Sequence, residues 1–183
     1  MKTAKIITTL AFIATSVAAS IIPRDATTIL NDINTIKTQL QKVHDDVQAF
    51  PGGPGSTLQA LGIKADSDTL DKTLQQSAKD AAASSSLSDS DSATVANAVT
   101  GLQSLIYSTL DLLVSKQPGF QNAILGQSAD SIVQSTLISL RSDTADFAGN
   151  VTNKLTPTLK RLAPLISSDI DFHYVRAIQA FST

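Results

Sequence analysis

The sequence predicts an all-α protein, a bundle of about five helices with a kink in the last one. Long stretches repeat apolar residues at alternating spacings of three and four, which places them on one helix face. No stretch shows the sustained alternation of β-branched residues that is typical of strands. The chain has 183 residues, of which 42% are hydrophobic and only 4% aromatic. We therefore expect residues 20–183 to form a single domain with an aliphatic core.

The first 19 residues have the pattern of a cleaved secretory signal peptide. Lys2 and Lys5 form a basic start, residues 6–18 form an apolar run, and Ala19 ends a stretch of small residues. The run is shorter than the ~20 residues that span a membrane, so no transmembrane segment is expected. Cleavage after Ala19 removes two lysines and shifts the formal net charge from -2 to -4. The pattern predicts a secreted, extracellular protein.

The clearest helix is predicted to follow Asp25, which is placed to cap it. Its apolar residues keep a strict spacing over three heptads, which is typical of a helix that packs lengthwise on a partner. The proline- and glycine-rich residues 51–55 should end it. The members of this stripe are Ile29, Ile33, Ile36, Leu40, Val43, Val47 and Phe50.

A second helix is expected to begin at Asp66 or Asp68, after a short turn that ends at Gly62. A Ser- and Asp-rich break at residues 84–92 then caps a third helix, which should end before Pro118. The second helix carries Leu70, Leu74, Ala78 and Ala81 on its apolar face. The third carries Val95, Val99, Leu102, Leu105, Ile106, Leu110 and Leu113.

The fourth and fifth helices are predicted from the same spacing. Gly149 should loosen the end of the fourth helix. Pro157 suits the first turn of the fifth helix, and Pro164 predicts a kink within it. The fourth helix carries Val133, Leu137, Leu140, Thr144, Phe147 and Val151 on one face. The fifth carries Leu159, Leu162, Ile166 and Ile170.

The composition excludes several functions. The chain has no Cys, and all 16 of its acidic residues are Asp, so thiolate chemistry and a Glu-completed calcium loop are excluded. A near-neutral charge argues against nucleic-acid binding. No catalytic or nucleotide-binding motif is present. The acidic groups at residues 44–46, 66–68 and 89–91 are interpreted as a solvated helix face and helix caps. We predict no enzyme activity, no metal site and no cofactor.

Asn150 begins the one N-glycosylation sequon, Asn150-Val151-Thr152. Secretion would make glycosylation of Asn150 possible, whereas its place on a helix between Phe147 and Val151 counts against it. The Ser-rich break at 84–92 is open to O-linked sugars or is simply a polar linker.

The apolar stripes have a second interpretation besides a packed core. Aliphatic stripes with few rings suit the lining of a tunnel for an extended acyl chain between facing helices. Gln103, Ser104 or Ser139 would then be candidates to bind the head group. The candidate lipid-binding residues are Ile33, Ile36, Leu40, Val43, Val99, Leu102, Leu105, Ile106, Val133, Leu137, Leu140, Phe147, Leu159, Leu162 and Ile166.

The layout resembles a family of fungal secreted cell-wall mannoproteins that includes hydrophobic surface-binding protein A. The similar features are residues 23–26 before the first helix, the Leu and Ile spacing from Ile29 to Val47 with Asp45-Asp46-Val47, and the Ser/Asp-rich break followed by an Ala/Val/Leu helix. The resemblance implies a five-helix bundle that holds a fatty acid or similar lipid and lies in, or is released from, the cell wall. It also implies an alternative: a surface-active adhesion protein that adsorbs to a hydrophobic surface or wall polysaccharide and recruits hydrolases.

Overall fold

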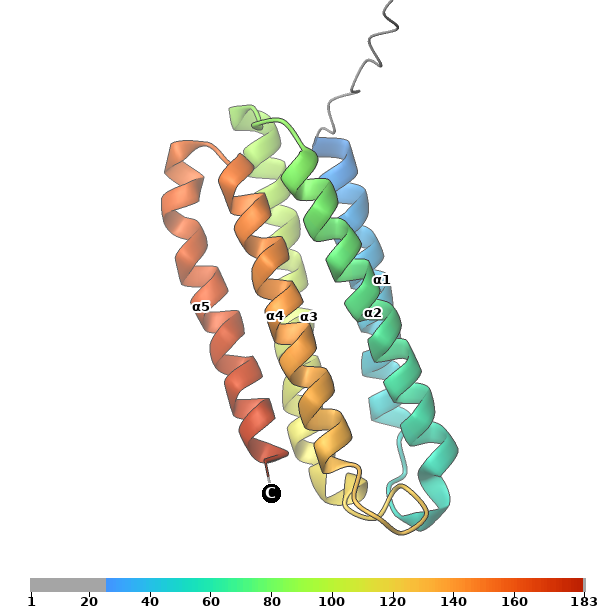
Figure 1. Ribbon diagram of the computed structural model, residues 1–183. Coiled ribbons are helices and arrows are strands. Elements are labelled where there is room, and N and C mark those ends of the chain that lie inside the picture. Colours follow the sequence, from blue (N-terminus) through green and yellow to red (C-terminus); the bar gives the residue numbers. More distant parts are fainter. Residues whose placement is uncertain (1–25, 183) are drawn as a thin grey trace, which may run out of the picture.

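A computed structural model describes residues 26–182, which form five long helices connected by short loops (Figure 1). The predicted signal peptide and the Asp25 cap lie outside these residues. The described residues contain no strand, and an isolated bridge joins Ile124 and Gln127. The all-α prediction is therefore confirmed. The helices are α1 (Ala26–Ala49), α2 (Thr57–Ala83), α3 (Asp89–Phe120), α4 (Asp130–Lys154) and α5 (Pro157–Ala180), with a short 3₁₀ turn at Pro54–Ser56.

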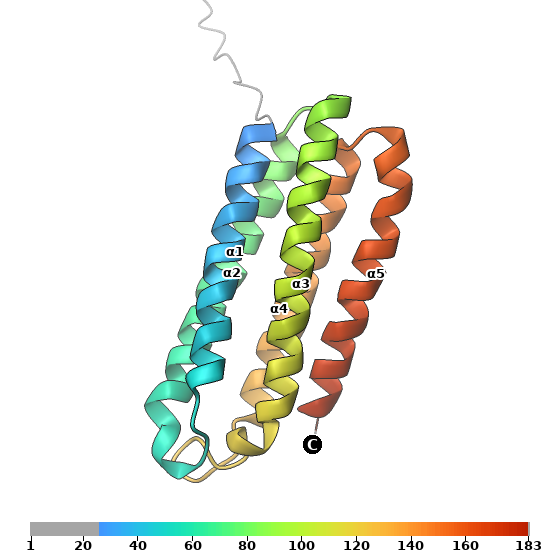
Figure 2. The same cartoon turned by 180° about the vertical axis from the view of Figure 1, so that it is seen from behind.

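The five helices form a closed ring. Around it, α1 packs on α2, α2 on α4, α4 on α5, α5 on α3, and α3 on α1, whereas α3 and α4 barely touch. Figures 1 and 2 show this arrangement from opposite sides. Because a ring of five helices is wider than a four-helix bundle, side chains from all five must fill its axis. This geometry leaves room for internal cavities.

Several predicted helix ends are wrong. α2 is continuous from Thr57 through Gly62, because a glycine inside a helix costs only about 1 kcal/mol, which the packing of α2 on α1 and α4 outweighs. Asp66 and Asp68 lie inside α2 rather than at its cap, where they pair with Lys42 and Lys64. The start of α3 agrees with the prediction: Ser88 of the Ser- and Asp-rich break is its cap, and its Oγ accepts a hydrogen bond from the backbone N–H of Asp91 at 3.1 Å.

Prolines and glycines interrupt the helices less than expected. α3 continues through Pro118 to Phe120, because burial of the Phe120 ring against Phe50, with ring centroids 4.2 Å apart, stabilises the last turn. α4 runs through Gly149 to Lys154. α5 starts at Pro157, as predicted, and is continuous across Pro164. The kink at Pro164 stays a prediction.

The aliphatic stripes form the core, and three phenylalanines close one end of it. Phe50, Phe120 and Phe181 are each 1% exposed, and Phe120 also contacts Phe181 edge to face. The chain comes very close to itself here: Gly53 N–H donates to the carbonyl of Gly119 at 3.0 Å. Among residues 26–182 no helix is long and apolar enough to span a membrane.

Candidate lipid-binding cavities

The interior of the ring contains a cavity of about 290 Å³, which we call the large cavity. Side chains from all five helices line it, and most are aliphatic. Its residues include Ile36 and Leu40 of α1, Leu70 and Leu74 of α2, and Phe147 of α4. Ligand sites commonly measure roughly 300–1,000 Å³, so this volume lies at the lower limit of that range.

A second cavity of about 60 Å³, the small cavity, lies toward the end of the ring that carries Phe120. Four residues line both cavities: Leu40, Leu70, Ile106 and Tyr174. The two cavities therefore meet end to end at the level of these side chains. Together they follow the bundle axis, which suits an extended chain better than a compact ligand.

Most of the predicted lipid-binding residues line these cavities. The large cavity includes Ile36, Leu40, Val99, Leu102, Ile106, Phe147, Leu159, Leu162 and Ile166. The small cavity includes Leu40, Val43, Ile106, Val133, Leu137 and Leu140. Two predicted residues line neither cavity. Ile33 is buried in the packed part of the core, and Leu105 packs against the core from the side, about 100° around α3 from Ile106.

The first half of α5 covers the large cavity without sealing it. The buried residues of α5 are Ile170, Tyr174 and Ala177, all in its second half. In the first half, Leu159 and Ile166 are half-buried and Leu162 is 52% exposed, although all three line the cavity. Sparse packing of this kind gives low local stability. This wall of the cavity is therefore the one that can move most easily.

Tyr174, which lines both cavities, belongs to a partly buried pair of hydroxyl groups. The Tyr174 hydroxyl and the Thr144 hydroxyl lie 3.2 Å apart, between α5 and α4. Burial raises the pKa of Tyr174 to about 12, so its phenol stays protonated at neutral pH. A protonated hydroxyl at this depth offers a polar contact within a mostly aliphatic lining.

Among the described lining residues of the two cavities, Lys64 is the one charged side chain. Its Nζ is paired with the Asp68 carboxylate at 2.6 Å, and the side chain is 36% exposed at the edge of the small cavity. Gln103, Ser104 and Ser139, the head-group contacts proposed from the sequence, line neither cavity and stay predictions that the geometry does not favour. The sequence does not indicate Lys64, because a single lysine in a helical pattern gives no sign that it lies at the edge of a cavity.

The two histidines do not build a metal site. His44 is half-buried rather than solvated, and its Nδ1 lies 3.3 Å from the Thr109 hydroxyl. His173 stacks on Tyr107, with ring centroids 3.9 Å apart. Within residues 26–182 no group of three metal-ligating side chains is brought together.

Asn150 faces α2 from α4. Its Nδ2 donates to the backbone carbonyl of Ala78 at 3.1 Å, and the residue is half-buried. A glycan on Nδ2 would compete with this contact for the same space. Glycosylation of Asn150 stays a prediction, and the geometry does not favour it.

The profile of the hydrophobic surface binding protein A family matches residues 26–153, from the first described residue to near the end of α4. The chain belongs to this family. No match was found among curated protein sequences. The family assignment agrees with the resemblance in the sequence.

Solved structures give the same fold. Afmp4p in complex with palmitic acid is 36% identical, with a TM-score of 0.80, and the match covers 86% of this chain and 100% of that one. Ligand binding domain 1 of the Penicillium marneffei MP1 protein, complexed with arachidonic acids, is 19% identical with a TM-score of 0.78. That match covers 87% of this chain and 99% of the domain. At that identity the second match supports the fold alone.

Proposed function

We propose that this member of the hydrophobic surface binding protein A family binds a long-chain fatty acid along the axis of its helical ring. The observation that carries the proposal is the pair of adjoining aliphatic cavities. The palmitic acid complex of Afmp4p supports it, because that protein is 36% identical over the whole of its chain. Binding, and not catalysis, is the activity that this lining can perform.

The large cavity is larger than the small packing defects that are ordinary in protein cores. The large cavity is not sealed beside α5, so water reaches a mostly aliphatic lining that offers it few hydrogen-bond partners. Leaving this lining in contact with water costs free energy in proportion to its apolar area. An occupant that fills the space removes this cost, so an apolar ligand should stabilise the fold considerably.

The energy of binding is also favourable. Each buried methylene contributes ~0.8 kcal/mol, so a sixteen-carbon chain gains on the order of 10 kcal/mol. Lost freedom of motion costs an estimated ~4 kcal/mol or more. We place the carboxylate at the edge of the small cavity near Lys64, where it keeps contact with water and a cation. The acyl chain then extends inward past Leu70 and Ile106.

Native mass spectrometry tests this proposal directly. The purified protein should carry a co-purified fatty acid, or take up one equivalent of palmitate after delipidation. Saturating palmitate should raise the unfolding midpoint, since binding at one hundred times Kd adds about 2.7 kcal/mol. A delipidated protein with no adduct and no thermal shift would contradict the proposal.

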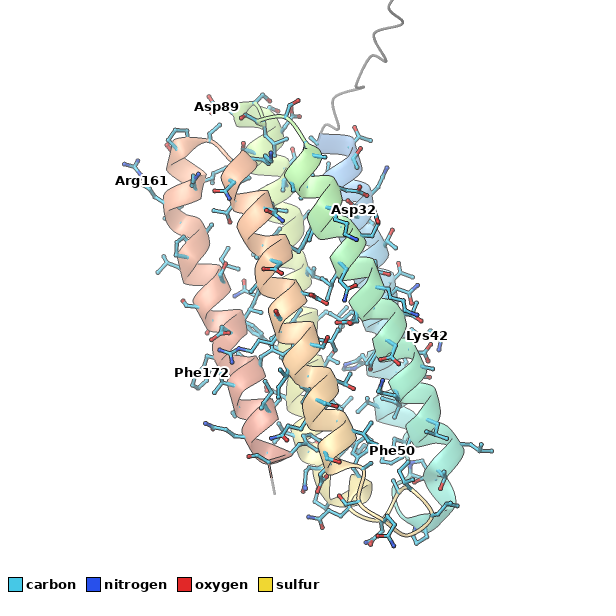
Figure 3. All side chains as sticks on the ribbon, in the orientation of Figure 1. Asp32, Lys42, Phe50, Asp89, Arg161 and Phe172 are labelled. Atoms are coloured by element: carbon cyan, nitrogen blue, oxygen red, sulfur yellow. The ribbon has the colours of Figure 1, made fainter. Side chains whose placement is uncertain are left out.

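A second candidate function is adsorption to a hydrophobic surface. It is favoured by large side chains that face solvent: Leu58, Leu125 and Phe172 are each more than 60% exposed. Figure 3 shows Phe172 on the outer side of α5. Depletion of the protein from solution by wax or polystyrene beads measures this activity. Recruitment of hydrolases and binding to wall polysaccharide remain proposals that rest on the family resemblance.

We also propose that the protein is secreted and associated with the cell wall. The N-terminal pattern of Lys2, Lys5 and the apolar run to Ala18 supports export. N-terminal sequencing of the protein from culture fluid and from a wall extract tests both points. A start at Ser20 in either fraction is expected, and retention of Met1 would contradict export.

A further inference from the structure

Two connections that are distant in sequence form one end of the bundle. The α1–α2 connection and the α3–α4 connection lie side by side there, at the lower end in both Figure 1 and Figure 2. Thr57 joins them: its Oγ1 donates to the Ala123 carbonyl at 2.7 Å and accepts from the Leu125 N–H at 3.1 Å. We call this end the apolar tip, defined by Leu58, Leu61, Leu125 and Ile132.

The apolar tip presents large aliphatic side chains to solvent. Leu58 is 82% exposed, Leu125 83%, Leu61 49% and Ile132 37%. Leu125 also has a φ of 50°, a conformation that is rare for residues other than glycine and asparagine or aspartate. The exposed leucines thus occur together at one end, on a backbone held by the Thr57 contacts. A cluster of this kind marks an interaction site.

Charge is distributed unevenly along the bundle. Residues 48–63 and 117–129, which contain Leu58, Leu61 and Leu125, have no charged residue, and Asp130, which lies two residues before Ile132, is buried. The opposite end carries Asp89, Asp91 and Arg161, and Figure 3 shows Asp89 and Arg161 at the end away from Phe50. An uncharged tip can leave water without the cost of desolvating an ion. This matches the uncharged interior of a lipid layer and not a charged or polar partner.

The apolar tip is also the edge of the small cavity. Leu61 and Ile132 belong to both, since each is exposed to solvent and lines the cavity. Ile124, in the loop beside Leu125, lines the cavity as well. The small cavity therefore has its edge at the surface of the tip, beside Lys64, and shares four lining residues with the large cavity.

We propose that the apolar tip docks on a lipid surface and is the route by which a fatty acid passes between that surface and the cavities. The proposal rests on the proposed function, because it concerns the loading of the same cavities. Docking buries the exposed leucines among acyl chains, and a fatty acid then enters without crossing water. The charged end stays in solvent.

The test uses full-length mature protein and the double variant Leu58→Asp/Leu125→Asp. Neither residue lines a cavity, and aspartate tolerates the positive φ of Leu125. Leu165→Asp on α5 is the matched control, since Leu165 is 70% exposed and also lines neither cavity. Thermal unfolding checks that all three proteins are folded.

Three measurements are made: partition onto phosphatidylcholine vesicles, the rate of palmitate transfer from those vesicles, and the Kd for monomeric palmitate in water. The double variant should lower partition and transfer rate by about tenfold or more. Its Kd should stay within about twofold of the wild-type value. Leu165→Asp should behave as wild type in all three measurements.

Equal effects of the tip variant and of Leu165→Asp, or no effect of either, would overturn the proposal. So would a wild-type dimer that ignores vesicles and that the tip variant dissociates, because the tip would then bind a second copy. A wild type that binds no palmitate from water overturns the proposed function and the entry route with it. If that wild type still partitions onto vesicles and the tip variant does not, the tip docks on lipid although the protein binds no fatty acid. The two failures can therefore be told apart.

Discussion

The hydroxyls of Tyr174 and Thr144 lie 3.2 Å apart, and both residues line the large cavity. The two partners differ in burial, since Tyr174 is 5% exposed and Thr144 is half-buried. Removing one hydroxyl should therefore not have the same effect as removing the other.

Thr144→Val leaves the Tyr174 phenol buried without a partner and should cost about 1–3 kcal/mol of unfolding free energy. Tyr174→Phe leaves Thr144 able to bond to water and should cost about 1 kcal/mol or less. Urea denaturation of both single variants and of the double variant measures this. The double variant should be more stable than Thr144→Val, and the reverse order would contradict the assignment.

Asp71 and Asp171 should make opposite contributions to the pH dependence of fold stability. The pKa of Asp71 is raised, first by burial and then by its contact with Asp143, and its Oδ1 is buried with no hydrogen-bond partner. The pKa of Asp171 is lowered by hydrogen bonds from Arg141, whose Nε lies 2.6 Å from Oδ1. A carboxyl group whose pKa is raised in the folded state adds to stability only at low pH. A carboxyl group whose pKa is lowered in the folded state adds to stability only at higher pH.

The Asp71→Asn variant should therefore gain stability relative to wild type as the pH rises above ~4, by about 1 kcal/mol at pH 7. At neutral pH, Asp171→Asn should lower the free energy of unfolding by less than ~1 kcal/mol, because the Arg141–Asp171 pair is about half exposed. At acid pH, where Asp171 is protonated, the substitution should have no effect. Unfolding curves at several pH values measure both slopes. Slopes of the same sign would contradict the prediction.

Filling the large cavity should block lipid uptake. Val99→Phe adds a ring to the cavity wall and should weaken palmitate binding at least about tenfold, since it removes space for one or two methylenes. Val114→Phe is the matched control: it is the same substitution at another half-buried position of α3 that lines neither cavity. Titration calorimetry with palmitate measures both, and equal losses would contradict the cavity site.

Lys64 should distinguish a carboxylate from an alcohol. Lys64→Gln should weaken palmitate binding about two- to fivefold, as expected for a partly exposed ion pair, and leave hexadecanol binding unchanged. Competition with a fluorescent fatty acid measures both ligands. An equal loss for the two would show that Lys64 contributes packing and not charge.

Replacement by alanine should have opposite effects on stability at two glycines of α3. A Cβ at Gly119 would lie 3.1 Å from Gly52 Cα, whereas a Cβ at Gly101 meets open space. Gly119→Ala should destabilise by about 1–3 kcal/mol, because the loop must move away. Gly101→Ala should stabilise by about 1 kcal/mol through helix propensity. Thermal unfolding of the two variants checks the sign of each effect.

Helix content and core were predictable because they depend on local spacing. The stripe from Ile29 to Val47 is buried as expected. Two predictions from local patterns were wrong: that the third helix ends before Pro118, and that the second helix begins at Asp66 or Asp68. Burial of Phe120 against Phe50 keeps the helix past the proline, and Asp66 pairs with Lys42 on the neighbouring helix. Both effects come from residues far away in the sequence, so no local pattern could signal them.

The sequence by itself determined that the protein is helical and aliphatic inside, because the spacing and chemistry of side chains act within a few residues. Only the tertiary structure decided which stripes surround a void and which are simply packed. Ile33 and Ile36 have the same local pattern, yet only Ile36 lines a cavity. The difference arises because cavity volume depends on how five helices close into a ring, a property of contacts between helices and not of any one of them.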